Sequence, residues 1–325
     1  MCIRSVAVVN KIILNCARLL PLCLFASFFS YSGEMTPQST PRSVTHAMGV
    51  TEVPQRAMRV ITLFQGATDS AVALGIHPIG VVDAWAEKPT YRYLREPLKE
   101  AVHVGLETQP NLETIAALHP DLIIGSTFRH EKIYAQLSQI APTVFTDNVS
   151  DFQQTLALTA QATGRESEGK KRLEQWQHRV TRIRAELQKS VPDWPITASI
   201  INVRSDHLRL YLQESFPGMV LSAIGFQLPK IKNAAGWGIK LKSKEALPAI
   251  NADVFFIIPH ADNAAVKQNF ESWRHHPLWR ILNAPKNNAV YTVERTSWLL
   301  SGGILGANQI LDQIANRYHL QSAVR

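Results

Sequence analysis

Two arginines of the sequence stand where a protein could hold an anion. Arg129 follows the apolar run Leu122–Gly125, and Arg204 directly follows the predicted strand Ala198–Val203. Uninterrupted apolar runs are typical of strands that are covered on both faces of a parallel sheet. Ligands of open α/β sheets bind beyond the carboxyl ends of such strands, where a guanidinium can grip carboxylate or hydroxamate oxygens. The two arginines therefore predict a clamp for an anionic ligand.

Several aromatic side chains in predicted loops and short strands could line the same site. Trp237 lies between two glycines, Trp298 precedes the glycines at 302–303, and Trp85 follows the predicted strand Ile79–Val82. Large aromatic side chains in loops commonly form the walls of ligand sites, although ordinary packing is the alternative for Trp237 and Trp298. Tyr211 shares a predicted strand face with Arg209. The start of the final helix, after the glycines, also favours an anion.

A near-duplication in the chain predicts the elements that position these residues. The block from Glu113 to Asp121 and the block from Glu245 to Asp253 both place an acid eight positions before an aspartate. Each block predicts a short amphipathic helix and a tight turn, and a buried apolar strand follows each aspartate. We therefore expect two similar Rossmann-like α/β lobes with a ligand cleft between them. Arg129 and Arg204 are expected to take equivalent places in the two lobes.

One long helix is predicted between the two copies. Leu173, Trp176, Val180, Ile183 and Leu187 recur at steps of three and four residues, which indicates a helix from 166 to about 190. Such a helix would span roughly 36 Å, enough to bridge two lobes. The predicted organisation is an N-terminal lobe at 33–165, the bridging helix at 166–190 and a C-terminal lobe at 191–325.

The first 32 residues are typical of a signal peptide. They hold Arg4, Lys11 and Arg18 without an acid, and the apolar stretch at 19–29 is shorter than the roughly 20 residues that span a bilayer. We therefore expect export to the periplasm and a mature chain without cysteine. Cys23 lies in a poor match to a lipoprotein signal, so a soluble periplasmic form is favoured over a lipid-anchored one.

Composition excludes several classes of function. The net charge of +8 falls to +5 when the three basic residues of the leader are removed, and no basic block with interleaved aromatics predicts nucleic-acid binding. The sequence has no Gly-x-Gly-x-x-Gly after a strand, phosphate-loop lysine or Gly-x-Ser-x-Gly elbow, so an enzyme is not expected. The eleven histidines are scattered, so a protein-ligated metal site is not expected either.

The chain resembles the periplasmic ferric-siderophore binding proteins, especially the ferric-citrate and ferric-hydroxamate branch. The resemblance runs from about Arg59 to about Ile314 and is carried by Val104–Leu106, Gln109–Glu113, Pro120–Ile124, Arg129-His130 and Gln139–Pro142. It implies the class III periplasmic binding protein fold and capture of an Fe(III)–siderophore, hydroxamate or citrate-based, without a cofactor. A haem or cobalamin binding protein of the same transporter class is the alternative.

The resemblance also implies roles for individual residues. Glu113 and Glu245 match the positions at which the family docks on its inner-membrane permease, which works with an ATPase. Trp237 and Trp298 match aromatic wall positions of the ferric-hydroxamate proteins. Glu107 departs from the pattern, because some relatives have arginine there, so we expect Glu107 to bind ligand hydroxyls or amines or to pair with Arg129. A monomer is expected.

Overall fold

The computed structural model describes residues 40–231, 234 and 236–321, which belong to one compact unit. The predicted signal peptide and Cys23 lie outside these residues. Among the described helices, none is long and apolar enough to cross a membrane. A hairpin of β1 (Arg42–His46) and β2 (Gly49–Val53) begins the described chain.

The first sheet has the strand order β6-β5-β4-β3-β7-β8 within the described residues. All neighbouring pairs are parallel except β5 and β6. The chain starts in the middle at β3, moves outward through β4 and β5, and returns to β7 on the other side. The strands are β3 (Val60–Thr62), β4 (Gly80–Asp83), β5 (Val102–Leu106), β6 (Gln109–Pro110), β7 (Leu122–Ser126) and β8 (Thr143–Thr146).

The second sheet has the order β11-β10-β9-β12-β13 in the part of the chain that is described. The strands β9, β12 and β13 are parallel, whereas β10 and β11 are antiparallel additions. We call each sheet with its flanking helices a lobe. The strands are β9 (Ala198–Val203), β10 (Leu208–Tyr211), β11 (Gly238–Leu241), β12 (Val254–Pro259) and β13 (Val290–Thr292).

Local signals explain where the helices begin and end. Asp151 caps α5 by accepting hydrogen bonds from two backbone N–H groups, and Gly164 ends it with φ 70°. Beside α6, the helices are α1 (Gln65–Ala73), α2 (Leu112–Ala117), α3 (Thr127–His130), α4 (Tyr134–Ile140), α5 (Phe152–Thr163), α7 (Phe216–Ile224), α8 (Ala264–Arg274), α9 (Pro277–Arg280), α10 (Asn283–Lys286) and α11 (Ile304–Arg317), with helical turns η1 (Arg92–Leu94), η2 (Glu131–Ile133), η3 (Lys244–Ile250) and η4 (Thr296–Leu300).

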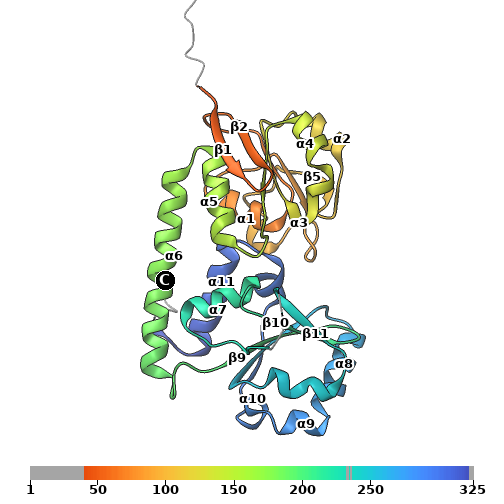
Figure 1. Ribbon diagram of the computed structural model, residues 1–325, viewed down its shortest axis with the longest axis vertical. Helices are drawn as coiled ribbons and strands as arrows, with labels where there is room; N and C mark the ends of the chain where they lie inside the picture. Colours follow the sequence, from red (N-terminus) through yellow and green to blue (C-terminus); the bar gives the residue numbers. More distant parts are fainter. Residues whose placement is uncertain (1–39, 232–233, 235, 322–325) are drawn as a thin grey trace, which may run out of the picture. The chain divides into compact units, whose positions relative to one another are not determined.

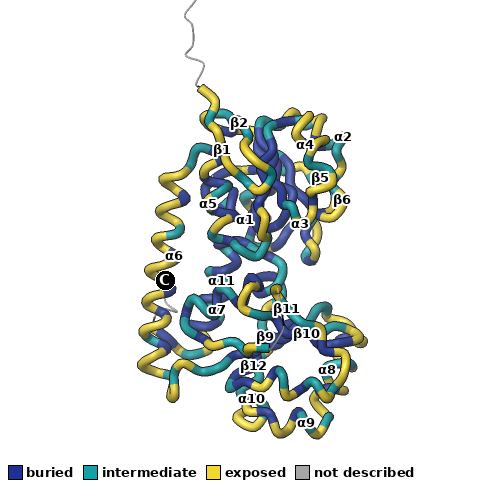
Figure 2. The backbone as a smooth tube through the Cα atoms, in the orientation of Figure 1, coloured by how far each residue is buried: buried dark blue, intermediate teal, exposed yellow. Residues whose placement is uncertain are grey.

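The helix α6 (Glu166–Ser190) runs along both lobes (Figure 1). Its apolar stripe packs on α5 of the first lobe and on α7 of the second, and its opposite face is exposed (Figure 2). The Trp176 ring meets Phe152 of α5 at 5.0 Å, and Phe152 meets Phe216 of α7 at 5.7 Å. The final helix α11 packs on α1 and α5 as well as on α7, so both lobes share one continuous core.

The duplicated aspartates form equivalent hydrogen bonds in the two lobes. Asp121, before β7, accepts hydrogen bonds from the backbone N–H groups of Met58 and Arg59, which precede β3, at 2.8 and 2.9 Å. Asp253, before β12, accepts hydrogen bonds from the backbone and hydroxyl of Thr197, which precedes β9, at 2.8 and 2.7 Å. Each carboxylate joins the starts of two adjacent parallel strands. The aspartates therefore pair β7 with β12 and β3 with β9 in the repeat.

This pairing corrects the expected equivalence of the two arginines. Arg129 follows β7, whose counterpart β12 is followed by His260. Arg204 follows β9, the counterpart of β3. The two arginines therefore occupy different places in the repeat, because the strand before Arg204 lies outside the duplicated block. Both still follow the carboxyl end of a parallel strand.

The start of α11 is occupied by a carboxylate of the protein itself. Asp69 of α1 accepts hydrogen bonds from the backbone N–H groups of Leu305 and Gly306 at 2.8 and 3.0 Å, and from the Tyr93 hydroxyl at 2.8 Å. A Cβ atom at Gly303 would lie 2.3 Å from Asp69. The expected ligand-anion site at this helix start is therefore wrong, because Asp69 fills it and Gly303 gives Asp69 room.

The burial of Asp69 predicts a pH-dependent stability. Burial raises the pKa of Asp69 from 3.8 to about 6, so the stability that this group contributes is present below pH 3.8 and is lost as the pH rises through 6. The side chain of an Asp69→Asn variant does not ionise. We therefore expect the unfolding free energy of the native protein, relative to the variant, to fall by about 2 kcal/mol between pH 4 and 7. Urea unfolding of both proteins across this range measures the difference, and a constant difference contradicts the prediction.

Candidate ligand-binding site

The site residues of the first lobe follow the carboxyl ends of its parallel strands. Gln65 follows β3, Trp85 follows β4, Glu107 follows β5, and Arg129 lies in α3 directly after β7. Since the strand order changes direction between β3 and β7, this edge is where an open α/β sheet binds its ligand. The structure therefore brings together three predicted residues, Trp85, Glu107 and Arg129, and adds Gln65.

Glu107 is the buried centre of this group. Its Oε1 accepts a hydrogen bond from Arg129 Nε at 3.1 Å, and its Oε2 accepts from Trp85 Nε1 at 3.1 Å and from the backbone N–H of Gln65 at 3.4 Å. Only 7% of the residue is exposed. Burial raises the pKa of Glu107, and the charge of Arg129 opposes this rise. Of the two expected roles of Glu107, the structure shows the pair with Arg129.

Arg129 is held so that the end of its guanidinium stays available. Its Cζ lies 4.6 Å from the ring centre of Phe128 and 5.7 Å from that of Trp85. These aromatic contacts orient the planar group. In the described part of the chain, only its Nε has a hydrogen-bond partner, and the side chain is 30% exposed. The two terminal nitrogens are therefore free to donate hydrogen bonds to ligand oxygens.

His130 holds together the backbone segments that carry Glu107 and Arg129. Its Nδ1 accepts a hydrogen bond from the Ser126 backbone N–H at 3.2 Å, so its Nε2 carries the proton and donates to the Glu107 carbonyl at 2.8 Å. Burial lowers the pKa of His130 to about 4, which keeps the ring neutral at physiological pH. The ring joins the end of β5 to the end of β7. Sequence reasoning used His130 only for the family resemblance and missed this role.

A second group of site residues lies on the second lobe. Arg204 donates from Nε to Asn202 Oδ1 at 3.2 Å and hydrogen-bonds Tyr211. The Tyr211 ring stacks on Trp237 at 5.6 Å, and Arg209 Cζ lies 4.9 Å from the same indole ring. The prediction that Arg209 and Tyr211 share a strand face is therefore confirmed. Because Tyr211 is only 5% exposed, its contribution is to support Trp237 and Arg204.

Arg295 and His260 also belong to the second group, and sequence reasoning missed them. The His260 backbone N–H donates to the Val203 carbonyl at 2.9 Å, and the His260 carbonyl accepts a hydrogen bond from Arg295. Burial lowers the pKa of His260, and nearby Arg204, Arg295 and Arg209 lower it further. His260 directly follows β12, and Arg295 lies just beyond β13. The strand-end rule that selected Arg204 would have found both if applied to every apolar run.

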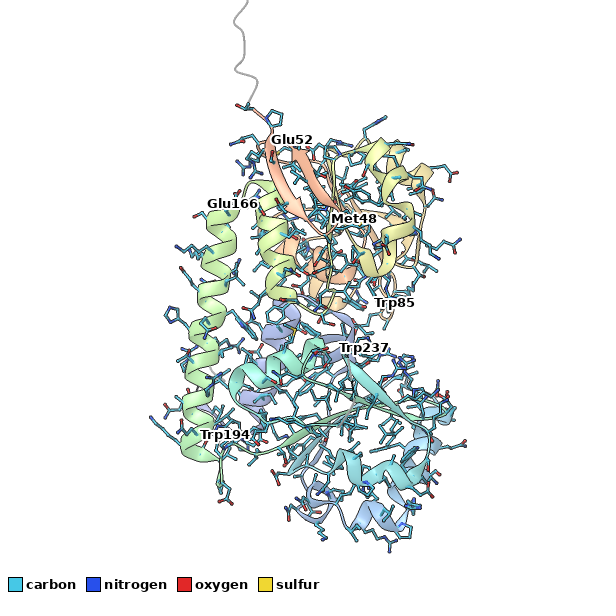
Figure 3. All side chains as sticks on the ribbon, viewed as in Figure 1. Met48, Glu52, Trp85, Glu166, Trp194 and Trp237 are labelled. Atoms are coloured by element: carbon cyan, nitrogen blue, oxygen red, sulfur yellow. The ribbon has the colours of Figure 1, made fainter. Side chains whose placement is uncertain are left out.

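The two groups lie on lobe edges that face each other. Figure 3 shows Trp85 at the edge of the first lobe and Trp237 at the facing edge of the second. They are 46% and 40% exposed, which is high for indole side chains. Tyr91, in the loop of Trp85, donates a hydrogen bond to the Leu300 carbonyl of η4 at 3.4 Å. This contact ties the two lobes together beside the site.

Trp298 does not belong to this site. Its side chain is fully buried, its Nε1 donates to Gln313 Oε1 at 2.9 Å, and its ring packs on Phe256 at 4.9 Å. The prediction that Trp298 forms a ligand wall is therefore wrong, because the turn η4 directs the indole into the core.

A pair of tryptophan variants separates the two roles. Trp237→Ala is expected to weaken ligand binding about tenfold, with little loss of stability, because the ring is exposed and packs mainly on Tyr211 and Arg209. Trp298→Phe is expected to lower the unfolding free energy by about 1–3 kcal/mol and to leave affinity unchanged. Thermal unfolding and ligand titration of both variants measure these effects. Reduced affinity in a stable Trp298→Phe variant would contradict this assignment.

Glu113 and Glu245 are exposed in corresponding helical turns. Glu113 lies in the first turn of α2, which Asn111 caps, and Glu245 lies in the first turn of η3, which Ser243 caps. The Ser243 hydroxyl also hydrogen-bonds the Glu245 carboxylate. The expected exposure of both side chains is confirmed. In the part of the chain that the structure describes, neither carboxylate forms a hydrogen bond or ion pair with the ligand-site residues, so these acids can serve a different partner.

The chemistry of the site is that of binding. Among the described residues, no three histidine, cysteine, aspartate or glutamate side chains gather as metal ligands. A hollow of about 860 Å³ lies elsewhere, between α6 and α11, and is lined by Arg172, Trp176, Arg179 and Asn308 among others. None of the predicted site residues lines it. The arginines and aromatic rings at the facing edges therefore remain the candidate site.

Known proteins share this architecture and sequence. The family described as "Periplasmic binding protein" matches residues 60–296. The chain is 51% identical over 259 residues to the "Achromobactin-binding periplasmic protein" of Dickeya dadantii (strain 3937), covering 79% of this chain and 85% of the relative. It is 36% identical over 295 residues to the "Probable siderophore-binding lipoprotein YfiY" of Bacillus subtilis (strain 168), covering 88% and 90%. The structure of Staphylococcus aureus SirA complexed with staphyloferrin B superimposes with a TM-score of 0.82 and 38% identity, covering 86% of this chain and 99% of SirA.

Proposed function

Because the chain belongs to the periplasmic binding protein family, we propose that it is the substrate-binding protein of an iron-siderophore ABC importer. It captures an Fe(III)–siderophore, hydroxamate or citrate-based, between its lobes and delivers it to the membrane permease. The fold is the two-lobe class III periplasmic binding protein fold, as the sequence predicted. The family consists of binding proteins, so the chain is not an enzyme.

One observation carries this proposal most strongly. Arg129 of the first lobe and Arg204, Arg209 and Arg295 of the second all lie at the site, together with the buried acid Glu107. Ferric complexes of citrate and of citrate-hydroxamates are anionic, so the arginines of the second lobe suit their carboxylates, and the free guanidinium nitrogens of Arg129 can donate hydrogen bonds to ligand oxygens on the facing side. The relatives named for siderophores favour this function over binding of haem or cobalamin.

Iron is substrate in this proposal, and the siderophore rather than the protein supplies its ligands. The arginine and tryptophan side chains of the site suit the outer surface of a chelate, where carboxylate oxygens and apolar rings are presented. The protein itself needs no cofactor.

We propose that the protein acts in the periplasm together with a membrane permease. Related proteins are named as periplasmic proteins or lipoproteins, and the predicted leader suits export to the periplasm. We favour a soluble monomer over a form that is lipid-anchored through Cys23. The exposed acids Glu113 and Glu245 are the proposed docking points for the permease and its ATPase.

A tryptophan-fluorescence titration tests the ligand class. Trp85 and Trp237 are exposed at the site, so ligand binding is expected to quench their emission. The panel is ferric citrate, a ferric citrate-hydroxamate, ferrichrome, a ferric catecholate, haem and cobalamin, with iron-free chelators as controls. Saturable quenching by a ferric citrate or hydroxamate class supports the proposal. Saturable quenching by haem or cobalamin alone would overturn the ligand, and no response to any compound would overturn the binding function.

A further inference from the structure

The two lobes present unequal charge to the site. In the first lobe, the charge of Arg129 is paired with the buried carboxylate of Glu107 at 3.1 Å. In the second lobe, Arg204, Arg209 and Arg295 form no ion pair with an acid among the described residues, since Asp206 pairs with His207 and Lys240. The first lobe therefore offers a dipolar group, whereas the second offers an excess of positive charge.

The surroundings of Glu107 compensate for the burial of its carboxylate. A carboxylate that is 7% exposed costs free energy unless it is paired and hydrogen-bonded, and both Glu107 oxygens accept hydrogen bonds. Its three donors are Arg129, Trp85 and Gln65, two of which are predicted site residues. A change at Glu107 therefore acts on the ligand through the groups that it orients and neutralises.

We infer that Glu107 is a specificity-determining residue: it cancels the charge of Arg129, so that the first lobe holds a neutral or dipolar part of the ligand and the second lobe holds its carboxylates. This inference rests on the proposed function and deepens it, because it assigns an uneven charge to the siderophore. A ligand with anionic groups at both ends would place one of them beside the Glu107 carboxylate, where like charges repel.

Two variants of Glu107 separate charge from position. Glu107→Gln keeps the length of the side chain and removes its charge, whereas Glu107→Asp keeps the charge on a shorter side chain. Glu96→Gln is the matched control, because it removes one exposed negative charge of the first lobe that pairs with Lys99. All variants are titrated with ferric citrate, which is anionic, and with ferrichrome, a neutral ferric hydroxamate, at low and high salt.

In Glu107→Gln, the affinity for ferric citrate relative to ferrichrome is expected to rise about tenfold at low salt, because an uncancelled Arg129 adds one positive charge. High salt should reduce this gain. Glu107→Asp and Glu96→Gln should keep the wild-type ratio. A ratio in Glu107→Gln equal to that of the wild type overturns the inference, and so does an equal loss of affinity for both chelates in the Gln and Asp variants, which indicates a purely structural role.

A double variant covers the case in which Glu107→Gln does not fold. Glu107→Gln/Arg129→Gln removes both charges of the pair, so no unpaired charge is left buried. Its ferric citrate to ferrichrome ratio is expected to lie within about twofold of the wild-type ratio, because the second lobe is intact. A ratio that falls tenfold would mean that Arg129 carries its full charge in the wild type, which overturns the inference. If wild-type protein binds no ferric citrate, ferric citrate-hydroxamate or ferrichrome, the proposed function fails instead.

Discussion

Replacement of Arg204 and Arg209 by glutamine is expected to weaken binding of an anionic ferric siderophore by about three orders of magnitude. Both side chains lie at the site on the second lobe, and each supports the aromatic pair of Tyr211 and Trp237. Removal of one well-aligned charge-assisted contact typically costs about 2–5 kcal/mol, and two such contacts are lost together.

Arg204 and Arg209 are better targets for substitution than Arg129. Arg129→Gln would leave Glu107 buried without its partner, and the loss of affinity would then include the cost of that unpaired carboxylate. Arg204 donates to the neutral Asn202 and Tyr211, and Arg209 lies over Trp237. Their replacement therefore leaves no buried acid unpaired among the described residues.

Isothermal titration of the double variant measures the effect. The control on α6, Lys170→Gln/Lys189→Gln, removes the same charge from exposed positions outside the site and is expected to keep wild-type affinity. Arg204→Lys/Arg209→Lys keeps the charge without the planar fork and is expected to bind at an intermediate level. Wild-type affinity in a folded Gln variant would place the anion site elsewhere in the molecule.

Loss of both exposed acids, Glu113 and Glu245, is expected to abolish iron uptake while leaving siderophore binding unchanged. Both side chains lie in the first turn of a helical element and are exposed, and within the described residues neither hydrogen-bonds or pairs with the site groups. Two carboxylates in matched positions suit a permease surface that presents two basic groups.

The experiment measures iron uptake and ligand affinity in the same variants. Cells that depend on this protein for siderophore iron receive Glu113→Ala/Glu245→Ala, and the purified variant is titrated with the ferric ligand. Glu96→Ala/Glu271→Ala removes two other exposed acids, which are 86% and 50% exposed, and should transport normally. Normal uptake by the Glu113/Glu245 variant would exclude these acids as docking points.

Local sequence patterns determined most of the secondary structure. The predicted strand Ala198–Val203 is observed with the same bounds, and the helix predicted from 166 to about 190 is observed as Glu166–Ser190. The alternating spacing of Trp176, Val180, Ile183 and Leu187 predicted α6, because a 3.6-residue period places them on one face. The strand-end rule placed Arg129 and Arg204 at the site, since parallel strands end along one edge of a sheet.

Only the tertiary structure decided what these side chains meet. The pairing of Glu107 with Arg129 joins residues 22 positions apart, and the contact of Asp69 with the start of α11 spans 236 positions. The burial of Trp298, and the pairing of β7 with β12 and of β3 with β9, also depend on contacts between residues far apart in the sequence. Periodicity reports which face of an element is apolar, but the partner of a buried charge is set by packing between elements. The sequence alone therefore determined the fold class and the arginines at the strand ends, and the tertiary structure decided that Glu107 neutralises one of them.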